Sequence, residues 1–233
     1  MSSALIPLFI GAYFLGAIPF GVIVARSHGV DILSFGSGNP GATNVGRALG
    51  SGWGSFVFIL DVLKGAIPAV VARSFITGTL HNLPDQLWWF LIGAAAILGH
   101  CLSPFLGFKG GKGIATSLGA GAGAAPWVAL PAFGLWIILF KITRYVSLSS
   151  LVAVVVAVIL SATVPGQARE LVPIFTLLAV FIFYRHRGNI RRLMDGTEPK
   201  YEGRKKDAEA RATSEGAEEK KGPNHVEPVA DNE

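Results

Sequence analysis

The stretch IATSLGAGAGAAPWVALPAFGLWIILF, residues 114–140, decides how often this chain would cross a membrane. It is long enough for one tilted span or for two short ones, because about twenty apolar helical residues cross a bilayer core. One crossing would place the cations that follow, Lys141 and Arg144 among them, on the outside. Two crossings, over residues 114–125 and 127–140, place every cationic loop inside, as the positive-inside rule requires. We therefore expect two short helices here.

The composition favours a membrane protein. Of 233 residues, 51% are hydrophobic and only 15% are charged, with a mean hydropathy of +0.51. Apolar segments near twenty residues recur up to Tyr184, and most of the charge follows that point. A soluble domain of this size does not need so many unbroken apolar runs. The other expected spans are residues 5–25, 53–71, 87–105, 148–164 and 171–184.

These spans predict an all-α integral membrane protein with seven transmembrane helices. No Lys or Arg precedes the first span and Arg26 follows it, which puts the N-terminus outside and the C-terminus in the cytoplasm. This order of charges is the reverse of a signal peptide. Residues 1–198 form the expected membrane domain. Residues 199–233 mix both charges without apolar periodicity, and we expect a disordered cytoplasmic tail.

Three polar stretches lie between the apolar runs, and this topology places all of them on the inner face. They are GSGNPGATNVGR at residues 36–47, FKGGKG at residues 108–113 and RHRGNIRRL at residues 185–193. Each combines fixed cations with glycines or small amides, which is the chemistry of an anion-binding nest. We expect one shared site for a phosphorylated substrate at the bilayer surface.

Each stretch also has a plainer interpretation. Asn39-Pro40-Gly41 is an ordinary turn signal. GGKG resembles the end of a P-loop but lacks the hydroxyl residue after the lysine, so what remains is an anion site at a helix N-terminus, or simple topology lysines. The Arg-rich stretch at residues 185–193 is equally typical of a topology anchor.

Five further residues of interest lie inside expected spans. Asp61 and Lys64 are three positions apart near mid-membrane and favour an ion pair, with substrate contact as the alternative. His100 has the chemistry of a general base or of a hydrogen-bonded packing residue. Gly119 and Gly123 form a small-xxx-small pair that lets a short helix pack closely.

The sequence contains no activated nucleophile. There is no GxSxG, no cysteine with a motif-spaced histidine, and no carboxylate cluster for Mg²⁺. This inventory suits transfer from an already activated donor whose leaving group is an anion held by Arg and Lys. An organophosphate transporter is the alternative, and it predicts broken helices at the midplane and related halves. The sequence shows no such repeat.

Together the stretches GSGNPGATNVGR, GHCLSPFLGFKGGKGIAT (residues 99–116) and HRGNIRRLMDGTE (residues 186–198) resemble the three signature motifs of the bacterial acyl-phosphate:glycerol-3-phosphate acyltransferase family. The resemblance covers residues 1–198. It implies a multi-pass enzyme of the bacterial inner membrane with a cytoplasmic active site. Such an enzyme joins an acyl phosphate to the 1-hydroxyl of sn-glycerol 3-phosphate, giving lysophosphatidic acid and phosphate in phospholipid biosynthesis. A related acyltransferase with a thioester donor is a further possibility.

The resemblance also implies partners and site residues. The expected partners are glycerol 3-phosphate, acyl phosphate, membrane lipid and a soluble enzyme that produces the acyl phosphate, without cofactor, metal or nucleic acid. The expected catalytic residues are Ser37, Arg47, Lys112, His186 and Asn189. Together with the polar stretches, it gives as substrate-binding residues Gly38, Asn39, Asn44, Lys109, Gly110, Gly111 and Gly113. The base is a side chain or a substrate phosphate oxygen. One departure is Ser103, where the family pattern has a proline. This difference affects the geometry expected at the helix end near His100.

Overall fold

A computed structural model describes residues 5–202 of the chain, and this part is helical, as expected. The helices are α1 Leu5–Ala17, α2 Phe20–Ser27, α3 Ala42–Leu49, α4 Ser51–Phe75, α5 Asp85–Cys101, α6 Ile114–Ala124, α7 Pro126–Thr143, α8 Val146–Thr163, α9 Leu171–Arg185 and α10 Arg187–Met194. A 3₁₀ turn follows α5 at Pro104–Leu106, and a small antiparallel hairpin pairs β1 Thr79–Leu80 with β2 Leu83–Pro84.

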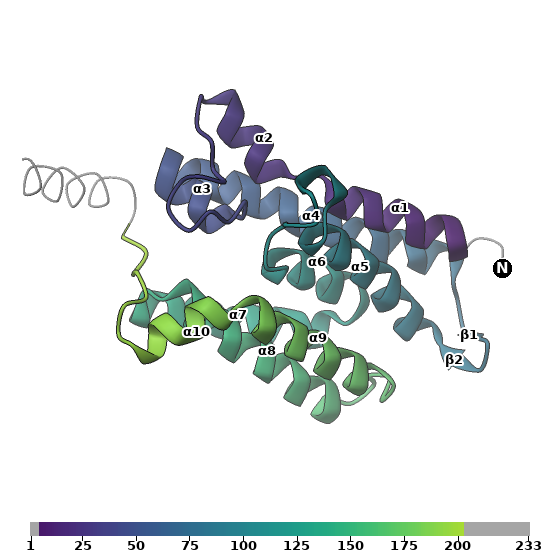
Figure 1. The fold of residues 1–233 in the computed structure, drawn as a ribbon. Helices are drawn as coiled ribbons and strands as arrows, with labels where there is room; N and C mark the ends of the chain where they lie inside the picture. The colour runs from purple at the N-terminus through teal and green to yellow at the C-terminus, as the bar shows by residue number, and fades with distance from the viewer. Residues whose placement is uncertain (1–4, 203–233) are drawn as a thin grey trace, which may run out of the picture.

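The helices form two groups (Figure 1). Helices α1 to α6 pack together, with α4 against α5 and α6 and with α1 along α5. Helices α7, α8 and α9 pack as successive neighbours, and α10 continues from α9 at the end of this group. The short α6 connects the groups because it contacts α4 and α5 on one side and α7 on the other.

The surface of the helices is that of a membrane protein. Large apolar side chains point outward along several helices, Ile6 and Ile10 on α1 and Ile138 and Ile142 on α7 among them. In the described residues, five helices or helix pairs are long and apolar enough to cross a membrane, or six if the bent pair α9–α10 is one span. Helix α6 has 11 residues and reaches only about 16 Å. Seven crossings and their direction therefore stay predictions.

Close backbone packing places α6 directly on α4. A Cβ at Gly119 would lie 1.9 Å from the carbonyl oxygen of Val62, and one at Gly123 would lie 2.7 Å from Cβ of Ala69. Only residues without a side chain allow this approach, which confirms the predicted small-xxx-small contact. The pairing fixes the N-terminal end of α6, which follows Lys112, against the middle of α4.

The structure differs from the expected spans at two breaks. The first span is interrupted between α1 and α2 at Ile18 and Pro19, because proline interrupts helical hydrogen bonding. The last expected span ends at Arg185, where the chain bends by 64° into α10. His186 lies at this bend and Asn189 lies in the first turn of α10, and both side chains line the same cleft.

Two further segments depart from the expected loop and tail. The second half of the first polar stretch is helical, since α3 begins at Ala42 and carries Arg47. Residues 199–202 of the expected tail pack onto the membrane domain: the N–H of Tyr201 donates to the carbonyl of Arg144 over 2.9 Å. The rest of the expected tail, residues 203–233, lies outside the described residues.

Candidate active site

A polar cleft of about 1190 Å³ is lined by residues of all three polar stretches. The expected site residues that line it are Ser37, Gly38, Asn39, Asn44, Arg47, Lys112, Gly113, His186 and Asn189. Helices α3 and α4, the loop before α6, the start of α8 and the α9–α10 bend all contribute to the lining. The structure therefore brings together segments that are about 150 positions apart, as the predicted common face required.

Hydrogen bonds of Asn44 shape the side of the cleft that is formed by α3 and the loop before it. Its Nδ2 donates to the carbonyls of Ile32 (3.2 Å) and Phe35 (2.9 Å), and its Oδ1 accepts the N–H of Ser37 over 3.3 Å. The side chain is 2% exposed. Asn44 thus folds the loop, while Ser37 remains exposed at the cleft.

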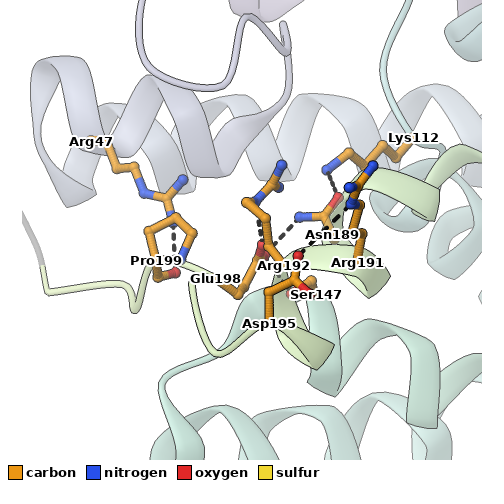
Figure 2. A network of polar contacts seen from close by, with 9 residues as sticks. All are labelled: Arg47, Lys112, Ser147, Asn189, Arg191, Arg192, Asp195, Glu198 and Pro199. Carbon is orange, nitrogen blue, oxygen red and sulfur yellow. Dashed lines mark hydrogen bonds and ion pairs between the residues drawn. The ribbon is translucent and has the colours of Figure 1, made fainter.

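Arg47 projects from α3 into the cleft. One guanidinium nitrogen, Nη2, donates to the carbonyl oxygen of Pro199 over 3.2 Å, as Figure 2 shows at its left side. A guanidinium carries five N–H donors in a planar fork, so one such bond leaves further donors for an anion in the cleft. The contact also fixes the segment that follows α10 to the opposite wall.

Lys112 reaches across the cleft to the third polar stretch. Its Nζ donates to Oδ1 of Asn189 over 2.5 Å. Burial lowers the pKa of Lys112 to about 8; Glu198 counteracts the shift, and the neighbouring arginines, Arg192 and Arg47 among them, increase it. A lysine in this state is a cation at neutral pH that an incoming phosphate would stabilise further.

Gly110 and Gly111 have a different arrangement from the one expected. Their N–H groups donate to the carbonyls of Cys101 and His100, each over 3.1 Å, at the end of α5. Their own carbonyls accept two bonds from Nη2 of Arg185, over 2.7 and 2.8 Å. Neither glycine lines the cleft, and the Lys109 side chain is exposed outside it. The two glycines fasten the loop before α6 to the end of α5 and, through Arg185, to the end of α9. Their N–H groups are therefore not presented to a ligand.

His186 occupies the bend between α9 and α10. It is 3% exposed, and its Nδ1 lies 2.9 Å from the carbonyl of Ile182. Because a carbonyl only accepts, this contact places the proton of a neutral imidazole on Nδ1 and leaves Nε2 as an acceptor. The ring lines the cleft close to Lys112 and Asn189.

The carboxylate of Glu198 orders this wall (Figure 2). Oε1 accepts hydrogen bonds from Ser147 Oγ (2.6 Å) and Asn189 Nδ2 (2.7 Å), and Oε2 accepts from Arg192 Nε (2.8 Å). Burial alone would raise the pKa of Glu198, but these three bonds outweigh it and hold the pKa below its usual range. Asn189 is thus held between Glu198 and Lys112, which fixes its amide orientation.

Several cleft residues were not assigned to the site from sequence. Glu198, Ser147, Arg185 and Arg192 line it. Asp61 and His100 line it as well, which fits the alternatives of substrate contact and general base that the sequence left open. The arginines were visible as part of a basic stretch, but nothing local separated them from topology anchors. Glu198 is the last residue of the third signature motif, HRGNIRRLMDGTE, but nothing in the sequence distinguished its role from that of Asp195 in the same motif.

The chain is similar to known proteins in sequence and in structure. The profile of the family described as "Glycerol-3-phosphate acyltransferase" matches residues 6–196. The glycerol-3-phosphate acyltransferase of Aquifex aeolicus is 45% identical over 83% of this chain and 97% of its own length. That of a Thermus thermophilus strain is 47% identical over 80% of this chain and 90% of its own.

Solved structures show the same fold. Two crystal structures of PlsY (YgiH), an integral membrane glycerol 3-phosphate acyltransferase, are each 43% identical in sequence to this chain. The match to the glycerol 3-phosphate form has a TM-score of 0.77 and covers 85% of this chain and 96% of the PlsY chain. The match to the lysophosphatidic acid form has a TM-score of 0.75 and covers 84% of this chain and 95% of the PlsY chain. The chain therefore belongs to the glycerol-3-phosphate acyltransferase family of integral membrane enzymes.

Proposed function

We propose that this protein transfers an acyl group from acyl phosphate to the 1-hydroxyl of sn-glycerol 3-phosphate, giving lysophosphatidic acid and phosphate. The observation that carries the proposal is the single cleft in which Arg47, Lys112 and Asn189 meet from three separate polar stretches. Two phosphate groups need several fixed cations, and this cleft is also lined by Arg185 and Arg192. The relatives' names, and the glycerol 3-phosphate and lysophosphatidic acid forms of PlsY, support the same substrates.

The reaction needs positioning and charge stabilisation more than activation. Acyl phosphate already has a good leaving group, so holding both substrates in one cleft supplies proximity. The hydroxyl oxygen attacks the acyl carbon, the carbon–oxygen bond to phosphate breaks, and the hydroxyl proton passes to a substrate phosphate oxygen. Arg47 and Lys112 stabilise the departing phosphate as its charge grows. Ser37 and His186 contact the reacting groups from the two walls.

The acyl chain fits the apolar side of the cleft. A cavity of about 80 Å³, lined almost entirely by apolar groups of α6 to α9, shares Phe58, Ile114, Trp136 and Ser150 with the cleft. If the acyl carbon lies among the cations of the cleft, the first methylene groups of the acyl chain lie beside these residues. The remaining chain would extend between helices toward lipid.

The membrane arrangement is part of the proposal. We place the protein in the bacterial inner membrane with seven crossings, the N-terminus outside and the cleft on the cytoplasmic face. The short helix α6, which packs against α4 and α5, is then one of the seven crossings. A soluble enzyme delivers acyl phosphate from the cytoplasm.

The donor is tested with the purified protein, glycerol 3-phosphate and either acyl phosphate or acyl-CoA. We expect equimolar phosphate and lysophosphatidic acid from acyl phosphate, without added metal or nucleotide. Acyl-CoA should give no comparable turnover. Equal turnover with acyl-CoA, or loss of activity on addition of a chelator, would contradict the proposed donor and mechanism.

A further inference from the structure

Three ionisable side chains lie together beneath the cleft, and the proposed reaction does not use them. Oδ1 of Asp61 is 2.8 Å from Nζ of Lys64 and 3.6 Å from Nδ1 of His100. Their side chains are 4%, 2% and 9% exposed. The first distance confirms the ion pair expected from the sequence. The position of His100 adds a third member that the sequence did not indicate.

This group lies between two cavities. Asp61 and His100 line the cleft, and all three residues line a cavity of about 10 Å³ beside the α1–α2 break. Nζ of Lys64 also donates to the carbonyl of Ile18 in that break over 3.1 Å. A buried ion pair contributes little net stability compared with apolar residues of the same volume. Stability alone therefore does not explain why such a pair lies next to a proposed substrate site.

His100 connects the pair to the loop that carries Lys112. Its backbone carbonyl accepts the N–H of Gly111, and its ring fills the space above Gly111: a Cβ there would lie 2.0 Å from Nε2. The carbonyl of Gly111 in turn holds Arg185, the residue before the α9–α10 bend. The carboxylate of Asp61 opposite Nδ1 favours a proton on that nitrogen and one orientation of the ring.

We propose that Asp61, fixed by Lys64, orients His100, and that His100 sets the position of the loop at residues 110–112 and of Arg185. On this account the three buried residues are positioning residues. They keep the loop that carries Lys112 aligned with the end of α9, so that the cations on both sides of the cleft stay at a fixed spacing. The inference rests on the proposed function of the cleft as the phosphate site. It assigns the buried group a role in the alignment of the substrates, beyond packing.

The first test keeps the ion pair and changes only the ring. His100→Gln should lower kcat at least about tenfold, which corresponds to about 1.4 kcal/mol of transition-state stabilisation, because the walls lose their alignment. The melting temperature in detergent should stay within about two degrees. A loss confined to KM, or unchanged kinetics, would overturn the inference.

The second test removes the pair without leaving a buried charge. Asp61→Leu combined with Lys64→Met conserves volume and should fold, because apolar replacements of buried pairs are often neutral. A purely structural pair predicts wild-type kcat in this double variant. Our inference predicts the same loss of kcat as His100→Gln, since His100 has no carboxylate beside it. Whichever of the two variants can be purified decides the question.

Matched controls use neighbouring positions. Asp85→Asn, at the other end of α5, removes a carboxylate that accepts local N–H bonds from Gly78 and Gln86 and should leave kcat unchanged. Gly111→Ala should reproduce the loss of His100→Gln, because the new methyl group displaces the ring. Gly52→Ala on α4, where a Cβ meets nothing within 4 Å, should be silent. A silent Gly111→Ala would contradict the route through His100.

The same assays separate failure of the inference from failure of the proposed function. Wild-type turnover with acyl phosphate, and its loss in Arg47→Lys, test the cleft and its donor. The comparison of His100→Gln and the double variant with wild type tests the positioning network, with whichever acyl donor supports turnover.

Discussion

Nζ of Lys112 donates a hydrogen bond to Oδ1 of Asn189, a residue 77 positions away, over 2.5 Å (Figure 2). This bond joins the loop before α6 to α10 and so closes one side of the cleft. Since Nδ2 of the same amide donates to Glu198, the lysine and the carboxylate are connected through Asn189. A substitution at any of the three residues should therefore change the position or the hydrogen bonding of the other two.

The protonation of Lys112 should appear in the pH dependence of the enzyme. Its pKa is lowered to about 8, so the free enzyme carries the cation below that pH and loses it above. We expect kcat/KM to fall as pH rises through about 8, because kcat/KM reports the free enzyme. In Lys112→Arg, which stays charged, this basic limb should disappear even if the maximum is lower. A limb at the same pH in both proteins would assign the titration to another group.

Glu198→Gln should impair both activity and stability. The amide cannot accept charge-assisted bonds from Ser147, Asn189 and Arg192 together, and it places an N–H donor among them. We expect kcat/KM to fall about tenfold or more. The control is Asp195→Asn: Asp195 pairs with Arg191 at 3.8 Å on an exposed surface, and a change there should be nearly neutral.

The stability part of this prediction has a definite sign with pH. The pKa of Glu198 is lower in the folded protein than its ordinary value of 4.5. Its contribution is therefore present above that value and is lost as pH falls through the lower folded pKa. The difference in melting temperature between wild type and Glu198→Gln should be largest at neutral pH and should shrink in acid. A constant difference would show that the ionised carboxylate is not the cause.

Two truncations test the strap formed by residues 199–202, which crosses from α10 to α3. A stop after Glu202 keeps the bonds from Arg47 to Pro199 and from Tyr201 to Arg144, and kcat/KM should stay within about twofold of wild type. A stop after Glu198 removes both bonds and leaves Arg47 unrestrained, so KM should rise several-fold. Similar kinetics for both truncations would show that the strap does not position Arg47.

Cysteine labelling tests the predicted direction of the crossings. On a Cys101→Ala background, exposed single cysteines at Ser34, Lys109 and Met194 should react with an impermeant maleimide only from the cytoplasmic side. Cysteines at Thr77 and Trp127 should react only from outside. Labelling of Trp127 and Lys109 from the same side would mean that α6 does not cross, and that the seven-span arrangement is wrong.

Much of the fold followed from local pattern. Apolar runs of sufficient length predicted helices close to those observed, and the cationic loops predicted that three distant stretches would meet. The breaks were harder to predict. Pro19 interrupts an apolar run that is otherwise continuous. The 64° bend at His186 lies beside Arg185, whose partners Gly110 and Gly111 are about 75 positions away in the sequence.

The site was less predictable than the fold. Polar residues of the right type indicated an anion site, but their partners depend on contacts across the whole chain. Asn44 turned out to fold its own loop, and the N–H groups of Gly111 and Gly110 are used at the end of α5. The role of Glu198 arises only when α8 and α10 come together, since its partner Ser147 is 51 positions away.

The central claim is that the cations of the cleft act on substrate phosphate and are not topology anchors. The most direct measurement is kcat/KM of Arg47→Lys with acyl phosphate and glycerol 3-phosphate, beside Arg191→Lys, an exposed arginine of the third polar stretch that does not line the cleft. Lysine keeps the charge but cannot form the planar fork, so we predict a loss of about a hundredfold for Arg47→Lys and none for Arg191→Lys. Near-normal kcat/KM for Arg47→Lys, in a protein that inserts and purifies as wild type does, would contradict the account.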